Sequence, residues 1–137
     1  MSNTVSVIMN TFNGNQRWLL DAAKSYLDQK TIEAQLIVST VKGDPSLETL
    51  SGLSNVEFCI NDTPGIYSQL NNALDLVDGS WFCYAAGDDV AFNNKFIKEI
   101  SSCKKAGKKI CSSGYVITDQ NLKEITRRGS DREYDIK

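Results

Sequence analysis

Residues 81–89 read WFCYAAGDD, an unbroken apolar run that ends in a glycine and two aspartates. An apolar run without alternation predicts a central strand covered on both faces, as in parallel sheets. The carboxylates of Asp88 and Asp89 at the exit of that strand suit Mg²⁺ or Mn²⁺, which prefer oxygen ligands. Gly87 would let a phosphate or another backbone approach closely. The alternative is a polar turn in which one aspartate caps a helix that begins near Asn93, and the motif alone favours this turn.

Strands and helices alternate on either side of this stretch. Apolar runs predict further strands at 5–9, 36–38 and 56–60, and a last strand that begins at residues 109–111. Between them, helical stripes recur at Leu19, Ala22, Ala23, Tyr26 and Leu27, at Ile66, Leu70, Ala73, Leu74 and Val77, and at Phe96, Ile97, Ile100 and Cys103.

Turn signals complete the pattern. Asp44-Pro45 predicts the start of a short helix through Leu53, and residues 119–121 predict a turn in a hairpin that reaches residues 124–126.

Repeated βα units predict an α/β fold, a mainly parallel sheet with helices on both faces in three α/β/α layers. Ligands of such sheets bind outside the carboxyl ends of the strands. The loops to consider are therefore 10–14, 39–44 and 86–89.

Composition narrows the classes of function. The chain has 137 residues, a length typical of one domain, with 15 basic and 17 acidic side chains. Such a balance predicts no nucleic-acid partner, and the apolar stretches are too short to predict a membrane span. Met1 to Thr4 resemble no signal peptide, so the expected location is cytoplasmic. The absence of histidine excludes Ser-His-Asp and His-ligated zinc chemistry, and the four cysteines lack metal-finger spacing and are interpreted as reduced structural residues.

Three stretches together resemble a known family. Residues 5–13 read VSVIMNTFN, residues 65–73 read GIYSQLNNA, and residues 78–82 read DGSWF ahead of Gly87-Asp88-Asp89. In order and spacing they resemble glycosyltransferase family 2, specifically the nucleotide-binding half of its GT-A fold. The resemblance implies a single GT-A-like, Rossmann-like domain over residues 1–137, with residues 126–137 as a tail.

The resemblance also implies a site. The donor would be a nucleotide-diphosphate sugar, with a UDP-sugar expected first, and Mn²⁺ or Mg²⁺ would bridge protein and pyrophosphate. Asp88 and Asp89 would hold the metal, and the direct ligand among the two is not assigned. The residues implied in contact with the donor are Thr11, Phe12, Asn13, Ser39, Gln69, Asn71 and Asp88.

Three departures from the family pattern bear on function. Ser39 and Thr40 stand where the family commonly has an aspartate that contacts the base, and Lys42 and Asp44 are candidates to replace it. Ala86 replaces the leading aspartate of the acidic motif. The family's catalytic base and acceptor site lie in a further segment, and no motif in residues 130–135 matches it, so the catalytic residue is unknown.

The expected activity is inverting glycosyl transfer to a saccharide or another hydroxyl acceptor, with a divalent metal. The alternatives are a non-catalytic nucleotide-sugar-binding module and a plain α/β interaction domain. Half of a GT-A fold would expose a sheet edge or an apolar face, which predicts a homo-oligomer or a partner chain.

Overall fold

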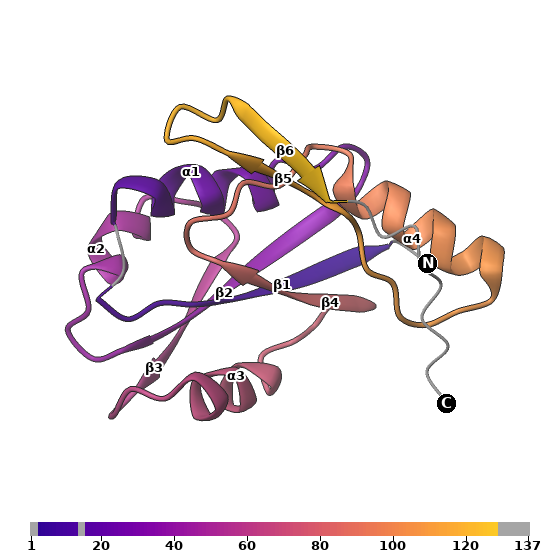
Figure 1. The fold of residues 1–137 in the computed structure, drawn as a ribbon. Coiled ribbons are helices and arrows are strands. Elements are labelled where there is room, and N and C mark those ends of the chain that lie inside the picture. The colour runs from indigo at the N-terminus through magenta and orange to yellow at the C-terminus, as the bar shows by residue number, and fades with distance from the viewer. Residues whose placement is uncertain (1–2, 14–15, 129–137) are drawn as a thin grey trace. The chain divides into compact units, whose positions relative to one another are not determined.

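The computed structural model describes residues 3–13 and 16–128, and the chain falls into two compact units, residues 1–97 and 98–137. The first unit holds a four-stranded sheet made of β1 (Thr4–Asn10), β2 (Glu33–Val41), β3 (Val56–Asn61) and β4 (Trp81–Ala86). All the pairs in this sheet are parallel and the strand order is β3-β2-β1-β4 (Figure 1). The predicted mainly parallel α/β sheet is confirmed.

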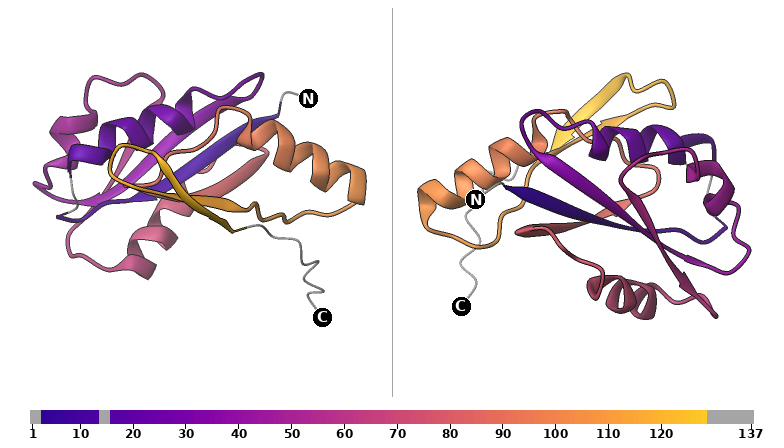
Figure 2. Two further views of the ribbon diagram at one scale, coloured as in Figure 1. Left: turned by 45° about the horizontal axis from the view of Figure 1, so that its top comes forward. Right: turned by 180° about the vertical axis from the view of Figure 1, so that it is seen from behind.

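Helices flank the sheet of the first unit. These are α1 (Gln16–Leu27), the short α2 (Ser46–Leu50) and α3 (Ile66–Leu74). α1 and α2 lie on one side of the sheet and α3 on the other, as both views in Figure 2 also show. The strands of this sheet run parallel because a helix after each of β1, β2 and β3 returns the chain to the start of the next strand.

The core lies on β1 and β2, the two inner strands. Val7, Ile8 and Met9 of β1 are fully buried, as are the β2 residues at 36–38. Ile8 packs with Ile37 and with Ala73 of α3 on one side of the sheet. Burying a large aliphatic side chain contributes about 1.5–3 kcal/mol, so these inner strands supply much of the driving force for folding.

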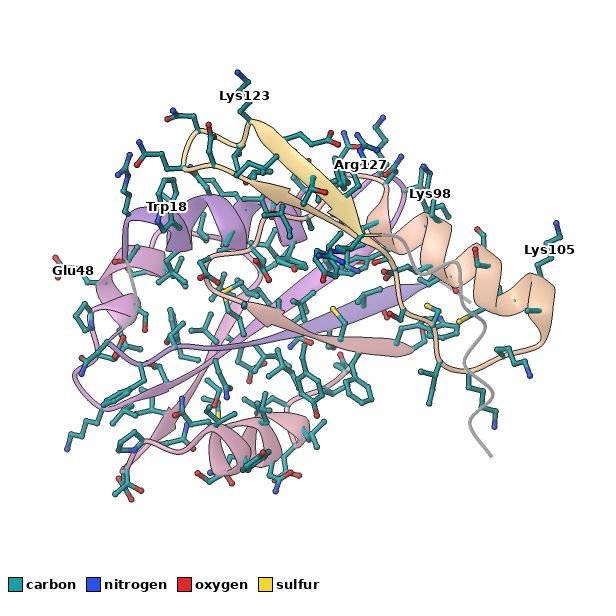
Figure 3. All side chains as sticks on the ribbon, viewed as in Figure 1. Trp18, Glu48, Lys98, Lys105, Lys123 and Arg127 are labelled. Carbon is teal, nitrogen blue, oxygen red and sulfur yellow. The ribbon has the colours of Figure 1, made fainter. Side chains whose placement is uncertain are left out.

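The stripe predicted on α1 is buried, whereas the stripe predicted on α3 is buried only in part, since Ile66 is 70% exposed. Leu19, Ala22, Ala23 and Tyr26 are the buried face of α1, and Ala73 is fully buried on α3. On the outer surface the guanidinium of Arg17 lies 4.4 Å from the centre of the Trp18 ring. Figure 3 shows Trp18 on the outer side of α1 and Glu48 extending outward from α2.

The position of β4 corrects one prediction. In the sheet that the described residues form, β4 is a terminal strand rather than a central one. Its burial alternates along the strand, and Phe82 and Tyr84 are 51% and 52% exposed. Their rings pack edge to face with centroids 5.8 Å apart. A buried aromatic side chain and a half-exposed one that packs on a neighbouring ring look alike in the sequence. The apolar run therefore could not show that β4 is terminal.

The second unit corrects another prediction. α4 (Lys95–Ala106) ends at Gly107, whose φ of 64° suits glycine at a helix C-terminus. The predicted start of the last strand at residues 109–111 is wrong, since those residues form neither helix nor strand and are exposed, and the strand begins later. The last strands are β5 (Tyr115–Thr118) and β6 (Glu124–Arg128), which pair antiparallel.

The predicted turn of this hairpin is confirmed. One carboxylate oxygen of Asp119 accepts the backbone N–H groups of Asn121 (2.8 Å) and Lys123 (3.0 Å). Residues 126–128, predicted as the beginning of a tail, belong to β6, and the rest of that segment lies outside the described residues. Within the described part of the chain, no helix is long and apolar enough to cross a membrane.

Candidate functional site

Three of the loops expected to hold the site meet at one edge of the sheet. Asn10, the last residue of β1, stands in register with Ser39 of β2 and with Ala86 at the end of β4. The loops that follow β1, β2 and β4 therefore leave the sheet side by side. In doubly wound sheets this carboxyl edge is where ligands bind.

Gly87 brings the acidic loop close to β1 and α1. A Cβ added at Gly87 would lie 3.1 Å from Cδ1 of Leu19 and 4.0 Å from Cγ2 of Thr11. The contact with Leu19 is tighter than ordinary van der Waals packing, so a larger residue would push the loop away. The close packing against Leu19 therefore explains a glycine at position 87 without any ligand.

Asp88 and Asp89 are both exposed in the loop after β4. The backbone N–H of Asp89 donates to the carbonyl of Ala86 (3.4 Å). Partial burial, and then the neighbouring charge of Asp88, raise the pKa of Asp89 above its ordinary value. Both causes disfavour the ionised pair, and a bound cation would reverse them. In residues 3–13 and 16–128 no third acidic or cysteine side chain joins a cluster that could hold a metal ion.

The loop after β1 is fixed at Thr11 and open at Phe12. Thr11 is buried, its N–H donates to the carbonyl of Ser39 (2.9 Å), and its hydroxyl lies 2.7 Å from that of Ser46. Phe12 is 49% exposed. Asn13 follows with φ of 46°, in the left-handed region that asparagine tolerates better than most residues.

A buried carboxylate ties this loop to α2. Asp44 is 7% exposed, and its two oxygens accept the N–H groups of Asn13 (3.0 Å) and Ser46 (2.9 Å). Burial, the largest influence, raises the pKa of Asp44, but hydrogen bonds from Ser46, Asn13 and Thr40 together outweigh it and hold the pKa below its ordinary value. The predicted cap at Asp44 therefore exists, and it also reaches the loop after β1.

Gln69 occupies the space between β1, β2 and α3. Its side chain is 3% exposed, and its Nε2 donates to the carbonyls of Thr11 (3.2 Å) and Ser39 (2.9 Å). Its Oε1 accepts the N–H of Gly65 (3.1 Å), and the hydroxyl of Ser39 donates to the backbone carbonyl of Gln69 (2.7 Å). Gln69 and Ser39 are thus engaged in protein contacts, and this arrangement gives them a structural task.

Asn71 differs from Gln69 although both were expected near the donor. It is exposed, and two residues along a helix turn a side chain by about 200°. The side chain of Asn71 therefore points away from Thr11 and Ser39, the residues that Gln69 contacts. The structure brings together Thr11, Ser39 and Gln69 by direct hydrogen bonds.

Two asparagines at this edge make contacts that sequence reasoning did not find: Asn61 was not selected, and Asn10 was selected only as the first residue of the loop 10–14. Asn61 at the end of β3 donates to the hydroxyl of Ser39 (3.1 Å) and to the carbonyl of Thr40 (2.9 Å), and it accepts from Asn72 (2.7 Å). Asn10 donates to the carbonyl of Ile66 (3.0 Å). Their common signal is an asparagine as the last residue of a strand, where a short polar side chain can reach neighbouring backbone groups.

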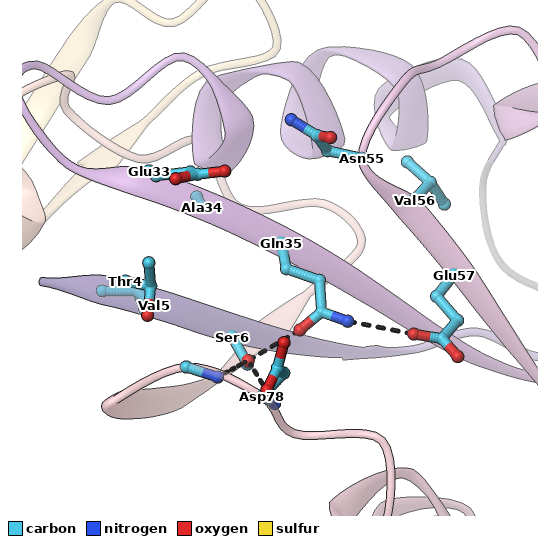
Figure 4. A pocket seen from close by; sticks show the side chains of 11 residues that line it. Thr4, Val5, Ser6, Glu33, Ala34, Gln35, Asn55, Val56, Glu57 and Asp78 are labelled. Carbon is cyan, nitrogen blue, oxygen red and sulfur yellow. Dashed lines mark hydrogen bonds between the residues drawn. The ribbon is translucent and has the colours of Figure 1, made fainter. Parts of the chain in front are cut away.

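A hollow of about 360 Å³ lies at the opposite end of the sheet, beside the amino ends of β1, β2 and β3 (Figure 4). The hydroxyl of Ser6 donates to Gln35 (2.8 Å) and accepts the N–H groups of Asp78 and Gly79. Gln35 in turn donates to Glu57 (3.0 Å). Ser6, Gln35 and Glu57 in this hollow are bonded to one another, and the loops expected to hold the site leave the other end, so we place the candidate site at the carboxyl edge.

The structural role of Gln69 can be tested by removing its polar atoms. Gln69→Met retains most of the volume but removes the partners of the Thr11 carbonyl and of the Gly65 N–H, which we expect to lower the free energy of unfolding by at least about 2 kcal/mol. Asn71→Ala on the same helix should change it by less than about 0.5 kcal/mol. Urea denaturation of both variants checks this, and equal stabilities would contradict the assigned role of Gln69.

The raised pKa of Asp89 predicts a pH-dependent gain in stability on its removal. A carboxyl group with a raised pKa in the folded state destabilises the fold when ionised, above that pKa, and has no such effect below its unfolded pKa of about 3.9. Asp89→Asn should therefore be more stable than the parent at pH 7 without metal, with the difference vanishing near pH 3. Thermal unfolding across pH measures this, and a variant less stable than the parent at pH 7 would refute it.

Comparison with protein-family models and with curated proteins found no match. The evidence for the parallel sheet, and for the position of Asp88 and Asp89 at its edge, therefore comes from the structure alone. The likeness to glycosyltransferase family 2 remains a prediction from the three sequence stretches.

Proposed function

We propose that the chain binds a nucleotide-diphosphate sugar with Mn²⁺ or Mg²⁺ at the carboxyl edge of its sheet, in a three-layer GT-A-like domain, and transfers the sugar with inversion. The observation that carries the proposal is the pairing of β4 with β1. This pairing sets the loop of Asp88 and Asp89 beside the loop of Thr11, Phe12 and Asn13. A metal-binding motif and a nucleotide-binding loop at neighbouring strand ends would serve one donor molecule.

The residues present fit a hard divalent cation. Asp88 and Asp89 offer exposed carboxylate oxygens, and Mg²⁺ is commonly held by one or two carboxylates together with substrate phosphates. When bound, the cation would supply charge neutralisation for the departing diphosphate. Partial burial and then the charge of Asp88 raise the pKa of Asp89, and both disfavour its ionised form, so a cation beside it would be electrostatically favourable.

The roles of the donor-binding candidates differ in this proposal. Phe12 presents an exposed ring to a nucleobase, whereas the exposed side chain of Asn71 lies on another face of α3 than Gln69 and has no contact with the donor in this proposal. Thr11, Ser39 and Gln69 form the buried support beneath the donor, because their side chains are already hydrogen-bonded within the protein. Base recognition therefore shifts from Ser39 to exposed groups such as that of Lys42.

A second function, binding without transfer, is favoured by one observation. Asp44 is a further carboxylate at this edge, but it is buried and already accepts two backbone N–H groups. Such a group is poorly placed to take the proton from an acceptor hydroxyl, which a general base must reach directly or through one water.

Ligand-dependent stability tests the donor site. We expect one nucleoside diphosphate among UDP, GDP, CDP and dTDP, UDP first, to raise the Tm only when Mn²⁺ is present. At about 100 times its Kd the ligand adds about 2.7 kcal/mol of stability. The shift should disappear in Asp89→Ala and persist in the matched control Asp62→Ala, which removes an exposed aspartate after β3.

No metal-dependent shift with any of the four nucleotides would reject the donor site. If a shift is found, incubation with the matching nucleotide sugar and simple saccharide acceptors separates the two functions. Release of the nucleoside diphosphate indicates transfer or hydrolysis, and its absence favours the binding module.

A further inference from the structure

We propose that Asp44 is a positioning residue that holds the loop after β1 in the conformation to which the nucleotide binds. This inference rests on the proposed function and adds a residue to it. Asp44 belongs to the loop after β2, yet one of its carboxylate oxygens accepts the N–H of Asn13 (3.0 Å) from the loop after β1. Its other oxygen accepts the N–H of Ser46 (2.9 Å) at the start of α2.

The contact falls on the residue of the loop that most needs support. Asn13 has φ of 46°, in the left-handed region that residues other than glycine adopt at a cost, although asparagine at a smaller one than most. A hydrogen bond from its N–H to an ionised carboxylate is stronger than one to a neutral acceptor. Asp44 therefore stabilises the conformation at the point where the chain would otherwise relax.

The same group of side chains fixes the other end of the loop. The hydroxyl of Ser46 lies 2.7 Å from that of Thr11 and 3.0 Å from that of Thr40. Phe12 lies between the two anchored residues, Thr11 and Asn13, and its ring is 49% exposed. Phe12 is therefore exposed on a loop whose backbone is fixed by hydrogen bonds at both neighbouring residues. A binding loop ordered before the ligand arrives loses less conformational freedom on binding, which increases affinity.

Substitutions of Asp44 separate the two contacts of the carboxylate. In Asp44→Asn the amide oxygen can accept only one of the two N–H groups, and the amide nitrogen cannot pair with the other, so this variant breaks one contact. Asp44→Ser, whose hydroxyl reaches Ser46 but not Asn13, breaks the contact with the loop specifically. The matched control is Asp119→Ser, which removes a charge from another turn carboxylate that accepts two backbone N–H groups.

The experiment measures nucleotide and metal binding separately on the full chain. We expect Asp44→Ser to raise the Kd of the Mn²⁺–nucleoside diphosphate complex, measured by calorimetry well below the Tm, by about tenfold or more. Binding of Mn²⁺ alone to Asp88 and Asp89 should not change, and hydrogen exchange at the Asn13 amide should accelerate. Asp119→Ser should bind nucleotide as the parent does.

The outcomes distinguish this inference from the proposed function. If the parent chain binds no nucleotide with Mn²⁺, the proposed function fails and this inference fails with it. If the parent binds and Asp44→Ser binds equally well, only the inference is overturned. If Asp44→Ser does not fold, Asp44→Asn takes its place, since it keeps the size of the side chain and hydrogen exchange at the Asn13 amide shows whether the contact with the loop is the one broken.

Discussion

The side-chain amide of Gln69 connects the parts of the fold that border the candidate site. It donates to the carbonyls of Thr11 and Ser39 and accepts from Gly65 at the start of α3. Leaving buried backbone groups without hydrogen bonds is costly. The amide is a partner for three such groups at once, and it shares the Ser39 carbonyl with the N–H of Thr11. Two inner strands and a helix are thereby fixed relative to one another at the edge where the loops begin.

Around this amide most buried polar groups of the carboxyl edge have partners, although the buried Oδ1 of Asn10 has none among the described residues, and the two aspartates after β4 differ from the rest. Beside β1 and β2, buried side chains such as Asp44 and Ser46 have partners within the protein. Beside β4, Asp88 and Asp89 place two carboxylates next to each other, and the pKa of Asp89 rises partly because of that repulsion. Perturbed ionisable groups concentrate at functional sites because function can require an arrangement that stability disfavours. The contrast supports a ligand of positive charge at the β4 side.

The sequence was sufficient to predict the βα order, the parallel sheet and the edge that carries the polar loops, because periodicity reports burial directly. It could not predict that β4 would be terminal, since Phe82 and Tyr84 look like core residues in any apolar run. It also could not tell that Gln69 is structural and Asn71 exposed. Both are polar residues on one helix, and only the tertiary contacts with Thr11 and Ser39 assign their roles.

The central claim is that a divalent cation and a nucleotide meet at the carboxyl edge of the sheet. The most direct measurement is paramagnetic line broadening of backbone amide resonances by Mn²⁺, with and without a nucleoside diphosphate. We expect strong broadening at residues 87–89 that extends to residues 11–13, and we expect it at a lower Mn²⁺ concentration when nucleotide is added. Broadening centred on Ser6, Gln35 and Glu57 at the opposite end of the sheet, or no localised broadening, would contradict it.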